Sequence, residues 1–356
     1  MIQTNQCTLG SDQLNKLSKT VQQNCHIADA AHAGDYTLCI YLLKMREFYR
    51  WEQKAAFSTN LENKNVGSWL KQREALWNNL EKIEYQNIKL DNESLSPFES
   101  SSINQNLLQY KLIYSGGMGL NNRPHFFLAE LERYEQHKEY TLYVAGKEYA
   151  RDMSAPPAMS HDNNIYIRKE SFRRLLWEKL ETWRWNKPDN ALGRAFACYN
   201  CDTDLDVALT QMTEDEVENV IQHERGEIKA GEILGDEWQD MLFSLPHSKS
   251  SIMLRAARDH LADSLTTLPY LLSKNSTASW HFYFGNLNNM RKDLYPTLIQ
   301  GYEEWYNTGS LSKMSEVIYE GKQHWLNTCI QALQIHQSNT ANQQSEIQKL
   351  IENNRL

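Results

Sequence analysis

Hydrophobic positions recur with helical spacing at both ends of the chain. In the first third, apolar residues return every three or four positions. This spacing predicts helices over residues 12–32, 36–56 and 67–85. It returns at residue 170 and predicts further helices over residues 170–185, 213–243, 250–273, 279–307 and 312–337. Pro269 and Pro296 fall inside two of these segments and are expected to kink or end them.

The middle of the chain has a different pattern. Short apolar segments alternate with Gly, Asn and Pro turns, which is typical of strands. The expected strands cover residues 110–115, 125–131, 140–145 and 164–168. Short polar connections between the later helices favour antiparallel neighbours. The predicted fold class is therefore mainly α (α+β), with N-terminal helices, a small antiparallel β insert and a C-terminal antiparallel helical bundle.

The pattern also predicts four regions along the chain. Residues 1–104 form an N-terminal helical region that ends in a polar, Ser-rich linker over 86–104. Residues 105–168 form the small β-rich insert, and residues 169–337 form the C-terminal helical bundle. The polar tail, residues 338–356, is expected to be frayed or loosely docked.

The composition and the net charge mainly exclude certain fold classes and protein classes. With only 15 Gly and 8 Pro in 356 residues, the chain is too poor in turn formers for an all-β fold. The net charge of -8 argues against a protein that coats nucleic acid. No apolar run is long enough to cross a membrane, and no secretory signal is visible. We expect a cytoplasmic protein with six free cysteines and no membrane partner, and leave a protein partner or homo-oligomer open.

The strongest candidate for chemistry is the string His223-Glu224-Arg225-Gly226-Glu227. On an ideal helix, Glu224 and Glu227 fall inside the apolar sector and His223 lies on its flank. Carboxylates on an apolar face are costly unless something neutralises them. Helical bundles build carboxylate-bridged metal sites from inward-facing Glu and His. The best specific hypothesis is a metal-dependent enzyme that binds a divalent metal (Fe, Mn or Zn).

Further ligands must come from other helices, because the string matches neither Glu-x-x-His nor His-Glu-x-x-His. His260 and His324 flank the apolar faces of their helices, whereas Asp259 and Asp263 point away and rank lower. The predicted metal ligands are His223, Glu224, Glu227, His260 and His324.

The alternative is a non-catalytic interaction or scaffold protein. Arg258 and Arg291 lie at the margins of inward helix faces. Either arginine could pair with Glu224 or Glu227 and leave a structural ion-pair network. Whether the chain is an enzyme therefore stays open at this point.

Four weaker motifs each have a structural interpretation. Arg46, Glu47 and Arg50 suit either an anion grip or, more simply, a salt bridge between helices. The string Ser115-Gly116-Gly117-Met118-Gly119 lacks the Lys-Ser/Thr of a phosphate loop and favours a glycine-rich hairpin. Arg151-Asp152 ends a strand just before Pro156-Pro157. His32 continues the apolar stripe of the first helix and is expected in the core, whereas His26 lies opposite and is expected in solvent.

Several longer strings resemble those of a bacterial family of unknown function. The resemblance spans nearly the whole chain and implies a two-part protein from a bacterial source, with no activity that can be transferred. The strings run from Asp35 to Glu52, from Ser115 to Gly119, from Ala150 to Asp152, from Ala155 to Pro157, from His223 to Glu227 and from His281 to Phe284.

The two hypotheses for Glu224 and Glu227 predict different outcomes when both are replaced by Gln. If they bind metal, elemental analysis should find a divalent metal that the double variant loses, with little loss of stability in chelator. If they pair with arginine, the substitution strands buried cations and costs about 3–5 kcal/mol in denaturant unfolding. A large loss with no metal in the wild-type protein would contradict the metal hypothesis.

Overall fold

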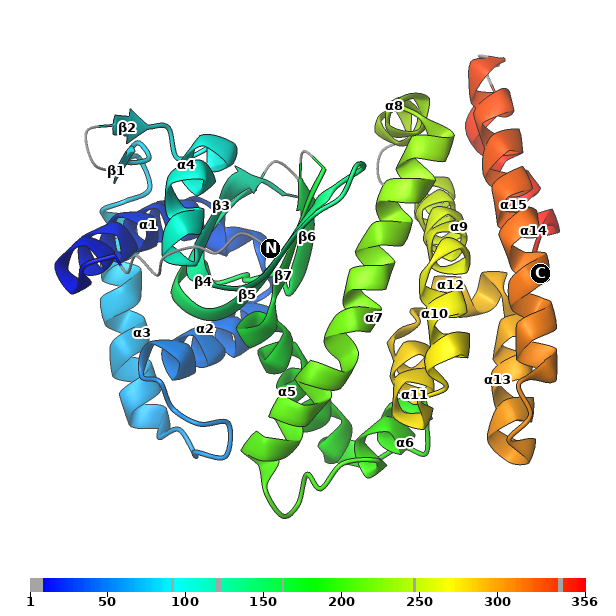
Figure 1. Cartoon of the computed structure of the whole chain (residues 1–356), viewed down its shortest axis with the longest axis horizontal. Helices are drawn as coiled ribbons and strands as arrows, with labels where there is room; N and C mark the ends of the chain where they lie inside the picture. Colours follow the sequence, from blue (N-terminus) through cyan, green and yellow to red (C-terminus); the bar gives the residue numbers. More distant parts are fainter. Residues whose placement is uncertain (1–8, 91–92, 120–122, 162, 246–247, 339–341) are drawn as a thin grey trace. The chain divides into compact units, whose positions relative to one another are not determined.

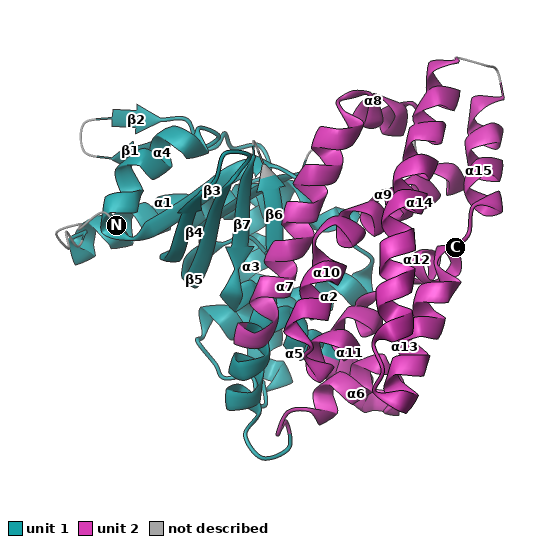
Figure 2. Ribbon diagram, turned by 45° about the vertical axis from the view of Figure 1, so that its right-hand side comes forward, with its two compact units in different colours: residues 1–179, 202–213 teal, residues 180–201, 214–356 magenta. Residues whose placement is uncertain are grey.

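The computed structural model describes residues 9–90, 93–119, 123–161, 163–245, 248–338 and 342–356. Helices dominate, and they are accompanied by a five-stranded sheet and a two-stranded sheet (Figure 1). The mainly α fold class with a β part is therefore confirmed. The chain divides into two compact units (Figure 2). The N-terminal unit comprises residues 1–179 and 202–213, and the C-terminal unit comprises residues 180–201 and 214–356.

In the N-terminal unit, helices and sheet share cores. Helix α1 (Ser11–His32) lays its apolar stripe against the sheet, burying Cys25 and Ala28 with Phe126 and Leu128. Its other side contributes Ile27 to a second core with the helices that follow. The remaining helices of this unit are α2 (Leu38–Glu52), α3 (Asn63–Asn78), α4 (Ser100–Leu107) and the first part of α5 (Lys169–Asn186).

The five-stranded sheet has the order β3-β4-β5-β7-β6. Its strands are β3 (Leu112–Met118), β4 (Pro124–Gln136), β5 (Thr141–Arg151), β6 (Ala158–His161) and β7 (Asn164–Arg168). The prediction of an antiparallel sheet is wrong at one position, because β7 runs parallel to β5. The strand that follows β5 in the chain, β6, lies two positions away from β5 in the sheet. The next strand, β7, occupies the position between β5 and β6.

The stretch 86–104, predicted as a polar linker, is instead folded. It contains β1 (Ile88–Leu90), β2 (Glu93–Leu95) and the start of α4. Ile88 and Ile103 are fully buried in the core beneath α1. The amide of Asn104 donates to the carbonyl of Tyr114 (2.8 Å) and accepts its N–H (2.9 Å), which ties α4 to β3. The few apolar residues here are too widely spaced among polar ones to register as a periodic pattern.

The C-terminal unit is helical throughout its described residues. Its helices include the last part of α5, α6 (Ala191–Ala197), most of α7 (Leu205–Leu234), α8 (Glu237–Ser244), α9 (Lys249–Leu265), α10 (Thr267–Lys274), α11 (Thr277–Asn286), α12 (Asn289–Leu294), α13 (Pro296–Thr308), α14 (Ser312–Gln337) and α15 (Gln343–Asn353). Three predicted long helices are broken into shorter ones. Gly235 adopts a positive φ of 70° and separates α7 from α8, and Pro296 begins α13 as predicted from its ring geometry.

The tail predicted to be frayed is docked. Ile347 and Ile351 of α15 are fully buried in the core of the C-terminal unit. The last residue also pairs through its backbone, because the N–H of Leu356 donates to the carbonyl of Leu294 (3.0 Å). Two apolar residues four positions apart are enough to fix a short helix that packs on larger neighbours. Among the described helices, none has both the length and the apolar character needed to cross a bilayer.

Shortening one buried side chain tests the docking of α15. Ile351→Ala should lower the free energy of unfolding by about 2–5 kcal/mol, because it leaves a cavity in a packed core. Lys349→Ala, on the exposed side of the same helix, is the matched control and should change it by less than about 0.5 kcal/mol. Denaturant unfolding measures both values. Equal and small effects would show that α15 is not part of the core.

Candidate functional site

Four of the five predicted metal ligands, His223, Glu227, His260 and His324, have other partners in the structure. Nδ1 of His223 lies 2.8 Å from Oδ1 of Asp263 on α9. Asp263 is fully buried and also accepts hydrogen bonds from Thr267 (3.0 Å), Tyr283 (2.9 Å) and Arg291. The sequence placed Asp263 on the outer side of its helix, and this placement is wrong. Helix α9 is covered on several sides, so its polar side is buried as well.

Glu227 is paired with an arginine. The guanidinium of Arg258 forms an ion pair with the Glu227 carboxylate and also donates to the Glu227 backbone carbonyl (3.1 Å). This is one of the pairs that the structural alternative predicted. Glu224 is partly exposed one turn earlier on α7.

His260 and His324 lie apart from these carboxylates. Nε2 of His260 lies 2.9 Å from the carbonyl oxygen of Arg291, and its ring stacks on Trp325. Nε2 of His324 lies 2.7 Å from the carbonyl oxygen of Asn354. Within the described ranges, no three His, Cys, Asp or Glu side chains are grouped so as to hold a metal ion. The metal centre stays a prediction without geometric support from these residues.

The charges around Asp263 stabilise one another. Burial alone would raise the pKa of Asp263, but Arg291 and His223 hold it well below its ordinary value. Burial likewise opposes the charged form of His223, yet the Asp263 carboxylate raises the pKa of His223 to about 9. The pair is therefore ionised on both sides at neutral pH and links α7 to α9.

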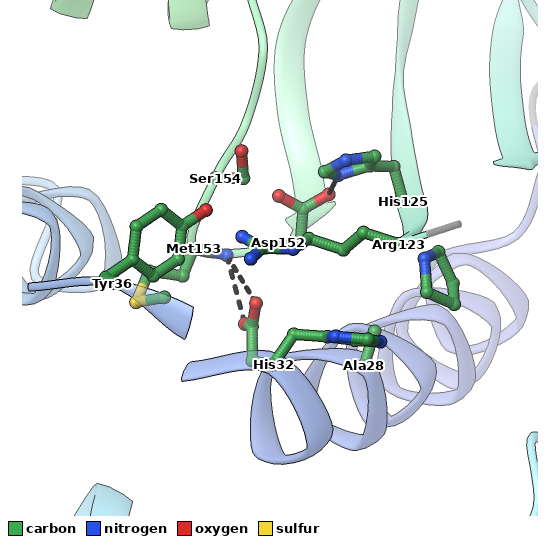
Figure 3. A pocket seen from close by; sticks show the side chains of 10 residues that line it. Ala28, His32, Tyr36, Arg123, His125, Asp152, Met153 and Ser154 are labelled. Carbon is green, nitrogen blue, oxygen red and sulfur yellow. Dashed lines mark hydrogen bonds and ion pairs between the residues drawn. The ribbon is translucent and has the colours of Figure 1, made fainter. Parts of the chain in front are cut away.

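A different group of polar residues lines a pocket in the N-terminal unit (Figure 3). Its inner space of about 10 Å³ is the size of one water molecule. It lies where α1, the start of β4 and the end of β5 meet. The lining residues are Ala28, Asp29, His32, Tyr36, Arg123, Pro124, His125, Asp152, Met153 and Ser154.

Asp152 is the central residue of this pocket. It follows the last residue of β5 and is only 2% exposed. Its Oδ1 accepts the backbone N–H of Ala155 (2.6 Å), and its Oδ2 lies 3.3 Å from Nδ1 of His125 on β4. An ionised carboxylate only accepts hydrogen bonds, so Nδ1 of His125 carries the proton in this contact. Figure 3 shows the two side chains joined in this way.

Asp29 reaches the same backbone segment from α1. Both of its carboxyl oxygens accept the N–H of Met153, at 3.1 and 3.0 Å. It is 6% exposed, and no lysine or arginine forms an ion pair with it among the described residues. Two acidic side chains therefore meet at Met153. Asp152 precedes Met153 in the chain, and Asp29 of α1 accepts the Met153 N–H.

The surroundings shift the pKa values of Asp29 and Asp152 in opposite directions. Burial and the nearby charge of Asp152 raise the pKa of Asp29 well above its ordinary value. Burial opposes ionisation of Asp152 too. Its hydrogen bond with His125, the positive charge that His125 carries when protonated, the charge of Arg168 and the Ala155 N–H nevertheless lower the pKa of Asp152. The surroundings therefore favour the acid form of Asp29 and the carboxylate form of Asp152.

The turn that carries Asp152 is strained. Ala155 has a φ of 40°, a left-handed conformation that is unfavourable for a residue with a side chain. Arg174 of α5 holds the turn from outside by donating to the carbonyls of Ser154 (3.1 Å) and Ala155 (2.8 Å). Strain of this kind persists only where the surrounding contacts enforce it, and it is frequent at functional sites.

The glycine string predicted as a hairpin shapes the other side of His125. Ser115 to Met118 lie in β3, which pairs antiparallel with β4, so the hairpin prediction is confirmed. A Cβ on Gly119 would lie 2.5 Å from Cδ2 and 2.8 Å from Nε2 of His125. Only glycine leaves room for the imidazole here. Nε2 of His125 has no hydrogen-bond partner among the described residues.

A cation lies at the rim of the pocket. Arg123 stacks over the ring of Tyr36, 4.5 Å from its centroid, and donates to Asp35 (2.8 Å). His32 also contacts Asp35, with Nδ1 3.2 Å from the carboxylate. In Figure 3 the Arg123 side chain extends across the pocket toward Tyr36.

The positions predicted for two histidines are reversed. His26 is buried beside Trp77, and burial followed by the charge of Arg73 lowers the pKa of His26 to about 3. His32, expected in the core, is part exposed at the pocket rim. The C-terminal half of α1 is covered by the sheet on one side and by α2 and α3 on the other, so its apolar stripe does not mark the only buried face.

The arginine motif of α2 forms a salt bridge within one helix. Nε of Arg50 donates to Glu47 (3.0 Å), and both side chains are buried. Arg50 also donates to the carbonyls of Ala56 and Thr59, so it fixes the chain after α2 rather than joining two helices. Arg46 lies 3.6 Å from Glu47.

The cysteine prediction is confirmed for the described residues. They are all free thiols, and Cys198 and Cys201 do not form a disulfide. Cys7 lies outside the described residues.

Sequence reasoning did not single out Asp29 or His125. The signals were present in the Arg151-Asp152 pair before Pro156-Pro157 and in the glycine string that faces His125. Neither signal places Asp29 beside Asp152, because 123 positions separate them along the chain and only the packing of α1 on the sheet joins them.

Comparison with known proteins gives two family matches. The model of the Family of unknown function (DUF6866) N-terminal domain matches residues 16–168, and that of the Family of unknown function (DUF6866) C-terminal domain matches residues 173–354. The two-part resemblance found in the sequence is therefore confirmed. No protein with a curated description matches the chain, and no solved structure matches it either.

The Asp263 ion pairs generate a prediction for stability. Asp263→Asn should lower the free energy of unfolding by about 3–5 kcal/mol, because it leaves the buried Arg291 without a counter-charge. Asp240→Asn, at an exposed position on α8, is the control and should have little effect. Similar values for the two variants in denaturant unfolding would contradict this role of Asp263.

The His223–Asp263 pair also predicts a dependence on pH. The folded pKa of His223, about 9, is above its ordinary value of 6.5, so the unfolded chain loses this proton first. The contribution of His223 is fully present below about pH 6.5 and is lost as the pH rises through about 9. Unfolding measured across this range should show a decline that His223→Gln reduces. An identical decline in both proteins would assign it to other groups.

Proposed function

We propose an acid–base catalytic function for this chain, which belongs to the family of unknown function DUF6866 through both of its domains. The proposed site is the pocket of the N-terminal unit, with Asp29, His125 and Asp152 as the reacting and positioning groups. The reaction class is hydrolysis or another proton transfer to a small polar substrate.

One observation supports this proposal above the others. Asp29 and Asp152 lie in one buried pocket, and their surroundings move the two pKa values apart. Two titratable groups arranged in this way can serve as acid and base at the same pH. Both acids also accept backbone hydrogen bonds, which hold them in place beside His125.

The contacts suggest a role for each side chain. Asp152 orients His125 through Nδ1 and leaves Nε2 free to take a proton as general base. Burial and the neighbouring Asp152 charge favour the protonated form of Asp29, which can deliver its proton to a leaving group as general acid. A water molecule in the inner space would be within reach of both groups.

The rim favours a substrate with a negative or strongly polar group. Arg123 projects across the pocket with its guanidinium held by Asp35 and Tyr36, so its position is fixed before a substrate binds.

For the C-terminal unit we infer a structural role as an antiparallel helical bundle. The Arg258–Glu227 pair and the saturated Asp263 carboxylate support the scaffold alternative. The metal-dependent enzyme remains a separate prediction, which the metal content of the purified protein tests.

Substitution of the two proposed catalytic groups tests the function. Chromogenic carboxylic esters, phosphate esters and amides form a panel for hydrolysis by the wild-type protein. Asp29→Asn and His125→Gln should each lower the rate on an accepted substrate by about 10²–10⁴-fold, the usual contribution of a general acid or base. His137→Gln, at an exposed histidine of the N-terminal unit, is the matched control and should retain the full rate.

Two outcomes would contradict the proposal. Hydrolysis that is equal in the wild-type protein and both pocket variants would place the chemistry elsewhere. A wild-type protein that hydrolyses nothing on the panel above the buffer rate would contradict a hydrolytic role for water in this pocket.

A further inference from the structure

The first half of α2 exposes an unusual amount of apolar surface. Leu38 is 70% exposed, Leu43 is 60% exposed, and Ile40 and Leu42 are each more than 40% exposed. Single exposed leucines are common, but a contiguous group of them marks an interaction surface. Buried contacts of this helix begin only at Met45. The early apolar residues of α2 therefore do not serve the core.

A groove lies beside these residues in the same unit. It has a volume of about 330 Å³ and is lined by Ala30, Ala33, Tyr41, Glu74, Trp77, Asn78 and Glu81. Tyr41 belongs to α2 and is three positions from Leu38, so Leu38 and Leu42 lie on the side of α2 next to the groove, whereas Ile40 and Leu43 lie on other sides of the helix. Its lining is mostly polar, and Ala30, Ala33 and the buried Trp77 are its apolar part.

The groove wall carries negative charge that the chain does not neutralise. Glu74 accepts a hydrogen bond from the Tyr41 hydroxyl (3.0 Å) but forms no ion pair with any residue that the structure describes. Glu81 is exposed and has no cationic partner among the described residues. Two carboxylates without an ion-pair partner among the described residues, beside the exposed Leu38 and Leu42, complement a ligand with one apolar side and one basic side.

We propose that this α2–α3 surface, made of Leu38, Leu42 and the groove, binds a basic amphipathic segment of a protein partner. The leucines would bury the apolar side of that segment, in the manner of a helix in a groove. Glu74 and Glu81 would pair with its lysines or arginines and set its orientation. This inference is independent of the catalytic proposal, because none of these residues lines the Asp152 pocket.

The same charges disfavour two other occupants. A second copy related by twofold symmetry would bring identical surfaces together and place Glu74 and Glu81 near their own equivalents. An anionic membrane surface would be repelled by the same carboxylates. A basic protein segment meets neither penalty.

Fluorescence anisotropy with a defined peptide tests the inference. The probe is a labelled helical peptide of leucine and lysine with its leucines on one face, and a scrambled peptide of the same composition is its control. Full-length protein should bind the probe in a saturable way. Leu38→Ser/Leu42→Ser and Glu74→Gln/Glu81→Gln should each weaken binding at least about tenfold, and added salt should weaken it for the wild type.

Matched controls separate specific binding from adsorption. Val207→Ser removes another exposed apolar residue of the N-terminal unit, outside α2 and α3, and should leave the affinity unchanged. Equal binding by all variants, or equal binding of the scrambled peptide, would overturn the proposal. Sedimentation that shows dimers lost in Leu38→Ser/Leu42→Ser would assign the surface to a second copy. Binding to neutral or anionic phospholipid vesicles that the leucine variant loses would assign it to a membrane.

Discussion

A buried carboxylate must be stabilised where it lies, and the N-terminal unit is arranged around that requirement at Asp152. Its side chain is almost fully buried and accepts from the Ala155 N–H, with His125 at its other oxygen. The turn after β5 takes up a strained conformation to supply that N–H. The cost of leaving such a charge without partners would be several kcal/mol. Contacts of this kind fix the geometry of the pocket before any substrate arrives.

The C-terminal unit also stabilises a buried carboxylate, Asp263, and supplies it with more partners. Asp263 accepts hydrogen bonds from Thr267, Tyr283 and Arg291 and contacts His223, so its hydrogen-bonding capacity is used up. Asp152 has fewer partners and shares its surroundings with a second acid, Asp29. A saturated carboxylate supports structure, whereas an acid pair with a free imidazole nitrogen beside it has capacity left for chemistry. This difference is why the proposed activity lies in the N-terminal unit.

Much of the helical pattern could be predicted from the sequence, because amphipathic helices such as α1 and α14 have a clear period. Their ends followed from glycine and proline, as at Pro296. The errors arise where a helix is buried on more than one side. The interior of α1 and of α9 includes polar residues, so His26 and Asp263 were assigned to solvent although both are in the core. One apolar stripe indicates one buried face of a helix, and it does not predict whether a second face of the same helix is buried as well.

The candidate site was harder to predict than the fold, since its residues come from α1, β4 and the end of β5. Arg151-Asp152 and the glycine string can be recognised as motifs in the sequence. The contact between Gly119 and His125, however, depends on the register in which β3 pairs with β4. The parallel pairing of β5 with β7 also could not be predicted, because strand patterns carry no direction. Helix spacing drew attention instead to His223 and Glu227, whose partners, Asp263 and Arg258, are on another helix.

Carboxyl carbon NMR measures the protonation states of Asp29 and Asp152 directly, and these states decide whether the pocket can supply both an acid and a base. A pH titration of ¹³C-labelled protein, with Asp29→Asn and Asp152→Asn to assign the signals, gives both pKa values. We expect Asp152 to stay ionised down to acidic pH and Asp29 to titrate well above the ordinary aspartate value of about 3.9. The Asp152→Asn variant should bring the pKa of Asp29 closer to that value, because it removes a neighbouring charge. Two signals that both titrate near the ordinary value would contradict the separation on which the proposed acid and base depend.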